Sequence, residues 1–410
     1  MSYKKYLIEK EQVSYDGGLT WSDTGREITG SSAIGVYESE CKCEGTCGYA
    51  DEYLTIESRE NSNIVRFTAS EFTATISAST NDGLAWTAFT ASSGSSVNIA
   101  TLQTGQKVLL KGLNERYHKV GQVSAGYECT IRTTHKCDLY GNIMSLVSGD
   151  TFESATSVAS YAFAYLLGHA DIVDASNLVL PATTLSEFCY LGMFHGCENL
   201  IAPPELPATV LAERCYEDMF GSCRSLTVAP ELPATTLAYR CYYYMFFGCY
   251  NLTTPPVLSA TTLANGCYEN MFDSCLSLTT APALPATTLA SGCYQGMFKS
   301  CENLTTPPIL SATTLETWCY CGMFEYCSGL TTAPVLPATT LVLRCYSGMF
   351  GGCTSLNYIK CLATDISASR CTFNWVDGVS SSGTFVKASS MTGWTTGING
   401  IPDNWTITNA

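Results

Sequence analysis

Cysteine is the residue that could do the most chemistry in this chain, because most of its 22 copies follow a regular pattern. One set recurs every 26 residues, and a second set follows it at a distance of eight residues. The first set stands at 189, 215, 241, 267, 293, 319, 345 and 371, and the second at 197, 223, 249, 275, 301, 327 and 353. Thiols at fixed spacing can form disulfides, bind a metal, act as nucleophiles or simply fill a core.

We expect these thiols to be reduced and buried. The N-terminal stretch "MSYKKYLIEKEQVSYDGGLTW" lacks the apolar core of a secretory signal, which favours a reducing compartment. Two cysteines eight apart on a turn and its exit lie too far from each other for a disulfide, which needs a Cα separation of about 4.4–6.8 Å. In a stack of repeats, each thiol would instead have two equivalent neighbours.

A separate cluster, Cys41, Cys43 and Cys47, offers three thiols that could bind zinc together with Cys129 or Cys137. Its spacing lacks the paired C-x-x-C knuckles that are typical of zinc sites. The alternative is that these thiols are free or become oxidised only under some conditions, and we favour that interpretation.

His195 lies two residues before Cys197 and invites a Cys–His nucleophile. The same position holds glycine, phenylalanine, aspartate, lysine and glutamate in other repeats, so we interpret it as a variable surface position. The chain contains neither a phosphate-binding glycine loop nor an H-E-x-x-H motif. We therefore predict a protein that is not an enzyme and uses no cofactor.

Two segments, "SYDGGLTW" from Ser14 and "STNDGLAW" from Ser79, match the Asp-box pattern S-x-D-x-G-x-T-W, the second with Asn81 and Ala85 substituted. In sialidase-like folds such boxes are hairpin turns remote from catalysis. We interpret both as hairpins. A sialidase-like glycosidase is the less favoured alternative, because no carboxylate pair at a fixed separation is singled out.

The elements that position the cysteines are copies of one template, roughly C-Y-x-x-M-F-x-x-C-x-x-L-T-T-x-P-x-L-P-A-T-T-L-x-x-x. Seven copies follow without insertion or deletion, and the middle copies alternate between "TTPP" and "TTAP", which indicates a 52-residue duplication. An exact repeat of one apolar set predicts a solenoid of 26-residue coils. Within each coil, L-T-T-x-P-x-L predicts a short strand of a parallel sheet, and C-Y-x-x-M-F-x-x-C predicts a helical turn.

The residues that differ between copies lie next to the first cysteine of each coil, and we expect them to face water. They include Ser186 to Phe188, Glu213–Arg214, Tyr239–Arg240 and Thr317–Trp318. Just before the repeats lies a degraded copy of the template. It has Leu166 and Leu167 at the positions of Met-Phe and Ala170 at the position of a cysteine, and it predicts an N-terminal capping coil.

Before the repeats, alternating apolar and polar segments such as "YLTIES", "NIVRFTA" and "KVLLKG" predict an antiparallel, sandwich-like β region. The predicted fold class is therefore mainly β, with this region followed by the solenoid and a cap. The predicted parts are a β-hairpin docking segment at 1–47, a sandwich-like domain at 48–140, the solenoid at 141–365 and the C-terminal cap at 366–410.

Charge and hydropathy limit the partners. The net charge is −15 with no basic tract, so we expect no nucleic-acid binding, and no apolar run is long enough for membrane insertion. Aromatic side chains that could stack on a glycan are Tyr243, Tyr244, Tyr250 and Trp318. Rows of threonine hydroxyls suit sugars or a protein, although threonine also simply favours strands. These rows comprise Thr253, Thr254, Thr279, Thr280, Thr305, Thr306, Thr331 and Thr332.

The template "LPATTLAxxCYxxMFxxCxxLTTAP" resembles the BspA-like leucine-rich repeats of gut Bacteroidetes and their phages. The flanking "EYLTIES", "NDGLAW", "KVLLKG", "YGNIMSL" and "SMTGWTTGINGIPDNWTI" resemble segments that accompany such repeats. The resemblance implies a right-handed solenoid with an adhesion or recognition role. The familiar family members have a shorter coil, and surface members carry export signals that this sequence lacks.

These observations favour a phage virion structural protein, a head or tail fibre or decoration subunit made in the host cytoplasm. We expect its N-terminal region to contact other virion proteins and its solenoid to bind a host-surface glycan or protein. The alternative is an adhesin of the same repeat class on a bacterial cell surface. The sequence leaves a homo-oligomer open, since it shows neither heptads nor a collagen-like segment.

Overall fold

The computed structural model describes residues 10–13, 22–27, 49–70, 72–121 and 128–410, the first two ranges by their backbone alone. The chain divides into two compact units, Met1–Gly45 and Thr46–Ala410. In the first unit, strands β1 (Lys10–Val13) and β2 (Ser22–Glu27) pair in antiparallel fashion. The first Asp-box-like segment and the cluster Cys41, Cys43 and Cys47 lie outside the described residues.

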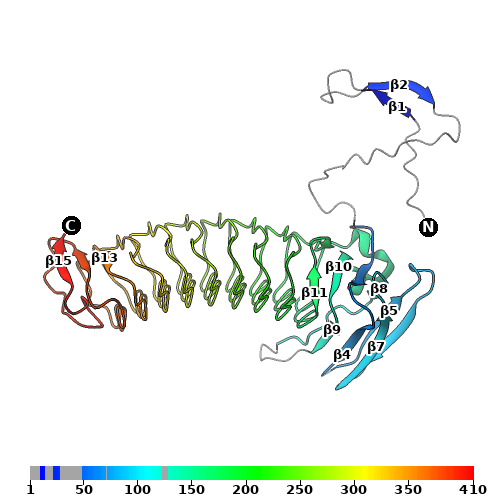
Figure 1. The fold of residues 1–410 in the computed structure, drawn as a ribbon, viewed down its shortest axis with the longest axis horizontal. Helices are drawn as coiled ribbons and strands as arrows, with labels where there is room; N and C mark the ends of the chain where they lie inside the picture. Colours follow the sequence, from blue (N-terminus) through cyan, green and yellow to red (C-terminus); the bar gives the residue numbers. More distant parts are fainter. Residues whose placement is uncertain (1–9, 14–21, 28–48, 71, 122–127) are drawn as a thin grey trace. The chain divides into compact units, whose positions relative to one another are not determined.

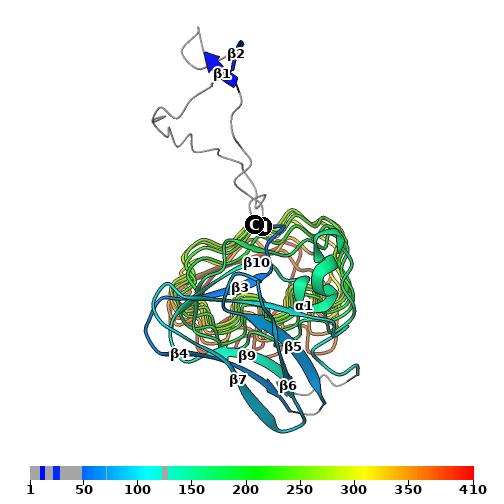
Figure 2. The same ribbon diagram turned by 90° about the vertical axis from the view of Figure 1, so that its right-hand side faces the viewer.

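The second unit begins with two antiparallel sheets (Figures 1 and 2). One has the order β10-β3-β8-β5-β6 and the other the order β7-β4-β9. Val65 and Phe67 of β4, Ile76 of β5 and Leu110 of β8 are buried in one hydrophobic cluster. The strands are β3 (Leu54–Ser58), β4 (Asn63–Ala69), β5 (Ala74–Ser79), β6 (Thr87–Ala91), β7 (Ser95–Leu102), β8 (Lys107–Gly112), β9 (Cys129–Thr133) and β10 (Cys137–Asn142). The strands expected in this region are confirmed.

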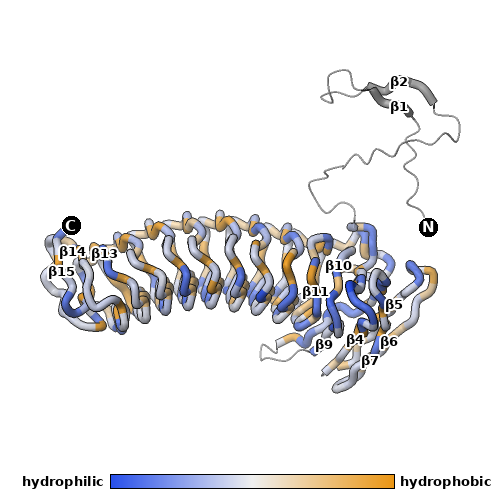
Figure 3. The backbone as a smooth tube through the Cα atoms, viewed as in Figure 1, coloured by the Kyte–Doolittle hydropathy of each residue, from blue (hydrophilic) through white to orange (hydrophobic). Residues whose placement is uncertain are grey.

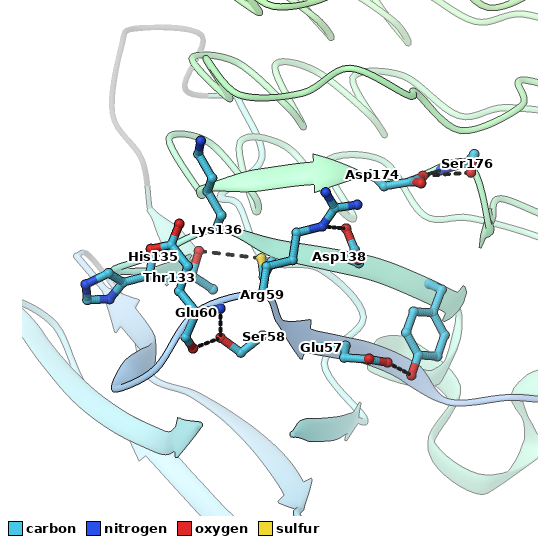
Figure 4. A network of polar contacts seen from close by, with 12 residues as sticks. Glu57, Ser58, Arg59, Glu60, Thr133, His135, Lys136, Asp138, Asp174 and Ser176 are labelled. Carbon is cyan, nitrogen blue, oxygen red and sulfur yellow. Dashed lines mark hydrogen bonds and ion pairs between the residues drawn. The ribbon is translucent and has the colours of Figure 1, made fainter. Parts of the chain in front are cut away.

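Strand β10 joins the antiparallel sheet to the repeats. It pairs in antiparallel fashion with β3 and in parallel fashion with β11 (Ile172–Asp174) and β12 (Leu178–Val179). Polar contacts flank this junction, among them an ion pair of 2.7 Å between Arg59 Nε and Asp138 Oδ1 (Figure 4). The predicted domain boundary after residue 140 falls inside β10, so one sheet continues across it. A short helix α1 (Ser145–Ser148) and a 3₁₀ helix η1 (Gly149–Ser154) follow β10.

The repeats stack in a row, and apolar residues recur at equivalent places of successive repeats (Figure 3). Two columns of aromatic rings run through the stack. The tyrosine column continues from Phe163 to Trp375 with centroids 5.7–6.3 Å apart. The phenylalanine column runs from Phe194 to Phe350 with centroids 5.6–5.8 Å apart. The described residues are thus mainly β and carry a repeating ladder of aromatic and cysteine side chains.

The C-Y-x-x-M-F-x-x-C segment is a run of turns, and the predicted helical turn is wrong. Every fourth residue has a positive φ, as at Phe188 (55°), Gly192 (54°) and Gly196 (70°), which a right-handed helix excludes. Backbone N–H groups donate alternately within the repeat and to the next one. Met193 N–H donates to the carbonyl oxygen of Tyr190, whereas Phe194 N–H donates to that of Met219 in the next repeat.

The L-T-T-x-P-x-L segment forms isolated parallel bridges instead of the predicted continuous sheet, and these bridges join the repeats in pairs. In every second repeat an alanine N–H donates to the next repeat, as Ala229 does to Thr254 and Ala281 to Thr306. The intervening repeats hold Pro255 or Pro307 at this position, and proline has no N–H to donate. The 52-residue alternation of the sequence therefore sets a two-repeat hydrogen-bonding unit.

Both ends of the stack are closed by atypical segments. At the N-terminal end, Leu167 N–H donates to the carbonyl oxygen of Met193, which places Leu167 opposite the phenylalanine column. At the C-terminal end, Trp375 stacks on Tyr346 and on Trp394, and a parallel sheet follows. Its strands are β13 (Tyr358–Cys361), β14 (Thr384–Lys387) and β15 (Thr406–Asn409). No helix in the described part of the chain has the length and apolar character of a membrane span.

Candidate functional site

The regular cysteines form two buried columns of thiols. In the second column the S–H group donates to the phenylalanine carbonyl of the preceding repeat, as Cys223 does to Phe194 and Cys275 does to Phe246, both at 3.2 Å. The 19 cysteines of the described residues are all free, and only Cys321 is more than slightly exposed. Burial raises the pKa of the Cys293 thiol to about 12. Because the thiolate is the reactive form, these cysteines serve as small apolar core residues.

Two of the candidate zinc ligands are placed by the structure. Cys129 begins β9 and Cys137 begins β10, and both are fully buried in the hydrophobic core. Burial is the main cause that raises the pKa of each thiol to about 12. Within the described residues, no three His, Cys, Asp or Glu side chains come close enough to hold a metal ion.

His195 does not pair with Cys197. Its Nδ1 lies 2.8 Å from Asp218 Oδ2 in the next repeat, and its ring meets the His169 ring edge-on at a centroid distance of 5.6 Å. The Cys197 thiol instead donates to the carbonyl oxygen of Leu167. Burial raises the pKa of Asp218, and its hydrogen bond with His195 opposes this shift. His195 is therefore partly buried in a polar contact between repeats, and the interpretation as a simple surface position is wrong.

The second Asp-box-like segment is the turn between β5 and β6. Ala85 N–H donates to Asn81 Oδ1 at 3.0 Å, and Gly83 N–H donates to Ser79 Oγ at 3.0 Å. The ring of Trp86 packs against Tyr53, and Lys111 Nζ lies 4.1 Å from the Trp86 ring centroid. These contacts give the segment a structural role in the hairpin.

The threonine rows are exposed along the repeats. Thr253 Oγ1 donates to the carbonyl oxygen of Thr227 at 3.2 Å, and Thr305 Oγ1 donates to that of Thr279 at 3.3 Å. These two hydroxyls thus bind the preceding repeat. None of the eight threonines lines the groove described below.

The two positions before the first cysteine of each repeat, together with the second position after it, form a second surface, which we call the lateral face. Tyr239 is exposed there, whereas Arg240 and Trp318 are half-buried. Phe188, which we expected to face water, is buried, because its ring stacks on Tyr161 of the capping repeat at 4.6 Å. At its N-terminal end the lateral face is therefore covered by the capping repeat.

One stretch of the lateral face is hollowed into an open groove of about 400 Å³. Of the predicted site residues, only Trp318 lines it. Tyr243 is not part of the lining, and its ring centroid lies 4.7 Å from the guanidinium of Arg240. Tyr244 packs against Tyr243 and Phe247. Sequence reasoning named Tyr239 and Arg240 only as variable positions and did not single out the remaining residues. The full lining is Tyr239, Arg240, Asn265, Gly266, Glu269, Ser291, Gly292, Gln295 and Trp318.

Comparison with known proteins gives no match, whether with family models, with curated proteins or with solved structures. The resemblance to BspA-like repeats therefore stays a prediction, and the functional argument depends on the geometry of this chain alone.

Proposed function

We propose that the chain is a recognition protein that is not an enzyme, in which a right-handed leucine-rich-repeat solenoid presents its lateral face to a host surface. The observation that carries this proposal is the separation of roles within each repeat. The cysteine, tyrosine, methionine and phenylalanine columns are buried and nearly invariant, while the neighbouring lateral positions change from repeat to repeat. Such an arrangement lets surface residues vary while the stack keeps its packing.

We further propose that the protein is a structural component of a phage virion, a head or tail fibre or decoration subunit. In this proposal the N-terminal unit and the sandwich-like region contact other virion proteins, and the repeats project toward a glycan or protein of the host. The resemblance of the repeat template supports a recognition role. A bacterial cell-surface adhesin would use the same repeats in the same way, so location distinguishes the two.

Mass spectrometry of purified virions tests this location directly. We expect peptides from the repeat region in washed particles at a stoichiometry consistent with a structural protein. Absence from particles, together with cleavage of the protein by protease added to intact bacteria, would contradict the virion proposal and favour the adhesin. Hydrolysis of chromogenic sialosides by the purified chain would contradict the proposal that it is not an enzyme.

A further inference from the structure

The groove on the lateral face exists because of two adjacent glycines in one column. The residue before the first cysteine is Phe188, Arg214, Arg240, Gly266, Gly292, Trp318, Arg344 and Arg370 in successive repeats. All eight have a positive φ, so the backbone is the same and only the side chains differ. Where the other repeats carry a large side chain, two glycines in succession leave a gap between Arg240 and Trp318.

The walls of this gap are Arg240 on one side and Trp318 on the other. Arg240 Nη2 lies 3.0 Å from Glu269 Oε2, and its guanidinium is flanked by the rings of Tyr239 and Tyr243. On the opposite wall, Trp318 lines the groove, and the guanidinium of Arg344 from the next repeat lies 4.4 Å from the Trp318 ring centroid. Cation–π contacts of this kind hold both side chains in place before any ligand binds.

The floor is polar. Backbone bonds fix the spacing of the repeats here, because Gly266 N–H donates to the Ser291 carbonyl and Gly292 N–H to the Thr317 carbonyl, both at 2.9 Å. Asn265 Oδ1 accepts from Ser291 N–H at 3.2 Å, and Ser291 Oγ donates to the Thr317 carbonyl oxygen at 3.1 Å. The Asn265 amide nitrogen can still donate, the Ser291 hydroxyl oxygen can still accept, and the Gln295 side-chain amide can do both. The only charged lining residues, Arg240 and Glu269, form an ion pair with each other, so the groove carries no excess of either charge.

We propose that this groove binds a short neutral saccharide, which stacks one pyranose ring on Trp318 and hydrogen-bonds its hydroxyls to the polar floor. A pyranose has an apolar C–H face and a rim of hydroxyls, which matches an aromatic wall beside amides and a carboxylate. The volume falls in the range of small-molecule sites, about 300–1,000 Å³. The inference rests on the recognition role proposed above and names the ligand class.

The test is binding of the full-length chain to an array of immobilised oligosaccharides that includes neutral, sialylated and sulfated members. We expect binding to neutral saccharides, and at least a tenfold loss with Gly292→Arg. Arginine is a native residue of this column at the same φ in four repeats, and a Cβ at Gly292 meets only Gln295 Oε1, at 3.6 Å, so the variant should fold. A far-ultraviolet circular dichroism spectrum checks that it does.

The matched control is Gly322→Asn, which lies outside the groove at φ 62°, in a column where Asn270 and Asn374 occur naturally. This variant should bind like the parent. Three results would overturn the inference: no saccharide bound by the parent, binding only to sialylated or sulfated members, or unchanged binding of Gly292→Arg. None of these would remove the protein from virions, so failure of the groove and failure of the virion proposal remain distinguishable.

Discussion

The antiparallel sheets and the repeats bury similar apolar side chains but connect them differently. In the sheets, β4 is bonded on both edges, to β7 and to β9, and its buried residues alternate with outward ones. In the repeats, half of the backbone bonds of the turn segment lead to the next copy, and each buried ring meets its own equivalents. The packing of a side chain in the repeats therefore depends on two neighbouring copies. The packing of a side chain in the sheets depends on the whole domain.

The largest expected effect comes from breaking a column in mid-stack. Phe272→Ala removes a ring that stacks on Phe246 and Phe298, at 5.7 Å from each. We expect the free energy of unfolding to fall by about 3–5 kcal/mol. Hydrogen exchange should show the loss confined to neighbouring repeats, with β3 to β9 still protected. The matched variant in the sheets, Phe67→Ala, should instead lower protection throughout them, and an equally local effect there would contradict the comparison.

Burial of Glu217 predicts a pH-dependent contribution to the stability of the repeats. Burial is the main cause that raises the pKa of Glu217 to about 7, with Arg214 opposing it. A raised carboxyl pKa means that the folded state binds more protons than the unfolded state. The contribution of Glu217 to the free energy of unfolding is therefore fully present below the unfolded pKa and is lost as the pH rises through about 7. The stability of the parent relative to Glu217→Gln should decrease by about 3 kcal/mol between pH 4 and pH 8. Denaturant unfolding at several pH values measures this, and a constant difference would contradict it.

A smaller effect is expected from single thiols. Cys275→Ala removes an S–H···O bond to Phe246 and leaves a small void, which we expect to lower the free energy of unfolding by about 1–2 kcal/mol. Adding reductant to the parent should leave its melting temperature unchanged, because the described cysteines are free. A melting temperature that falls on addition of reductant would show that disulfides stabilise the stack.

The smallest effect tests the two-repeat hydrogen-bonding unit. Pro255→Ala supplies an N–H where alternate repeats have Ala229 and Ala281. The new hydrogen bond to the next repeat stabilises the folded state, whereas losing the rigid proline increases the entropy of the unfolded chain. Because these effects oppose each other, the free energy of unfolding should change by less than about 1 kcal/mol. The informative signal is protection of the new amide from hydrogen exchange. An unprotected amide would mean that the alternation does not control the pairing.

The period and the buried set could be predicted from the sequence, because the columns at Cys189, Tyr190, Met193, Phe194 and Cys197 repeat without interruption. The turn conformation could not be predicted, because Met and Phe follow Tyr at distances of three and four residues, and this spacing suits a helix equally well. The decisive signal was present in the columns of Gly192 and Gly196, where glycine, serine, asparagine and aspartate predominate.

The groove could not be predicted, because it depends on which residues of different repeats lie beside one another. Gly266 and Gly292 are 26 residues apart in sequence, and Arg240 and Trp318 bracket them only once the register of the stack is known. The sequence predicts a surface position for Phe188 for a related reason. Its column faces water in other repeats, but Tyr161 of the capping repeat covers it.

The central claim is that every repeat is an invariant buried scaffold with recognition confined to its surface, and thiol alkylation tests it in all repeats at once. The native chain is treated with iodoacetamide, digested and analysed by mass spectrometry. We predict that the cysteines of both columns, from Cys189 to Cys371, stay unlabelled until denaturant is added, whereas half-buried Cys321 is modified first among the described thiols. Rapid labelling of either column, or disulfides between neighbouring repeats, would contradict the account.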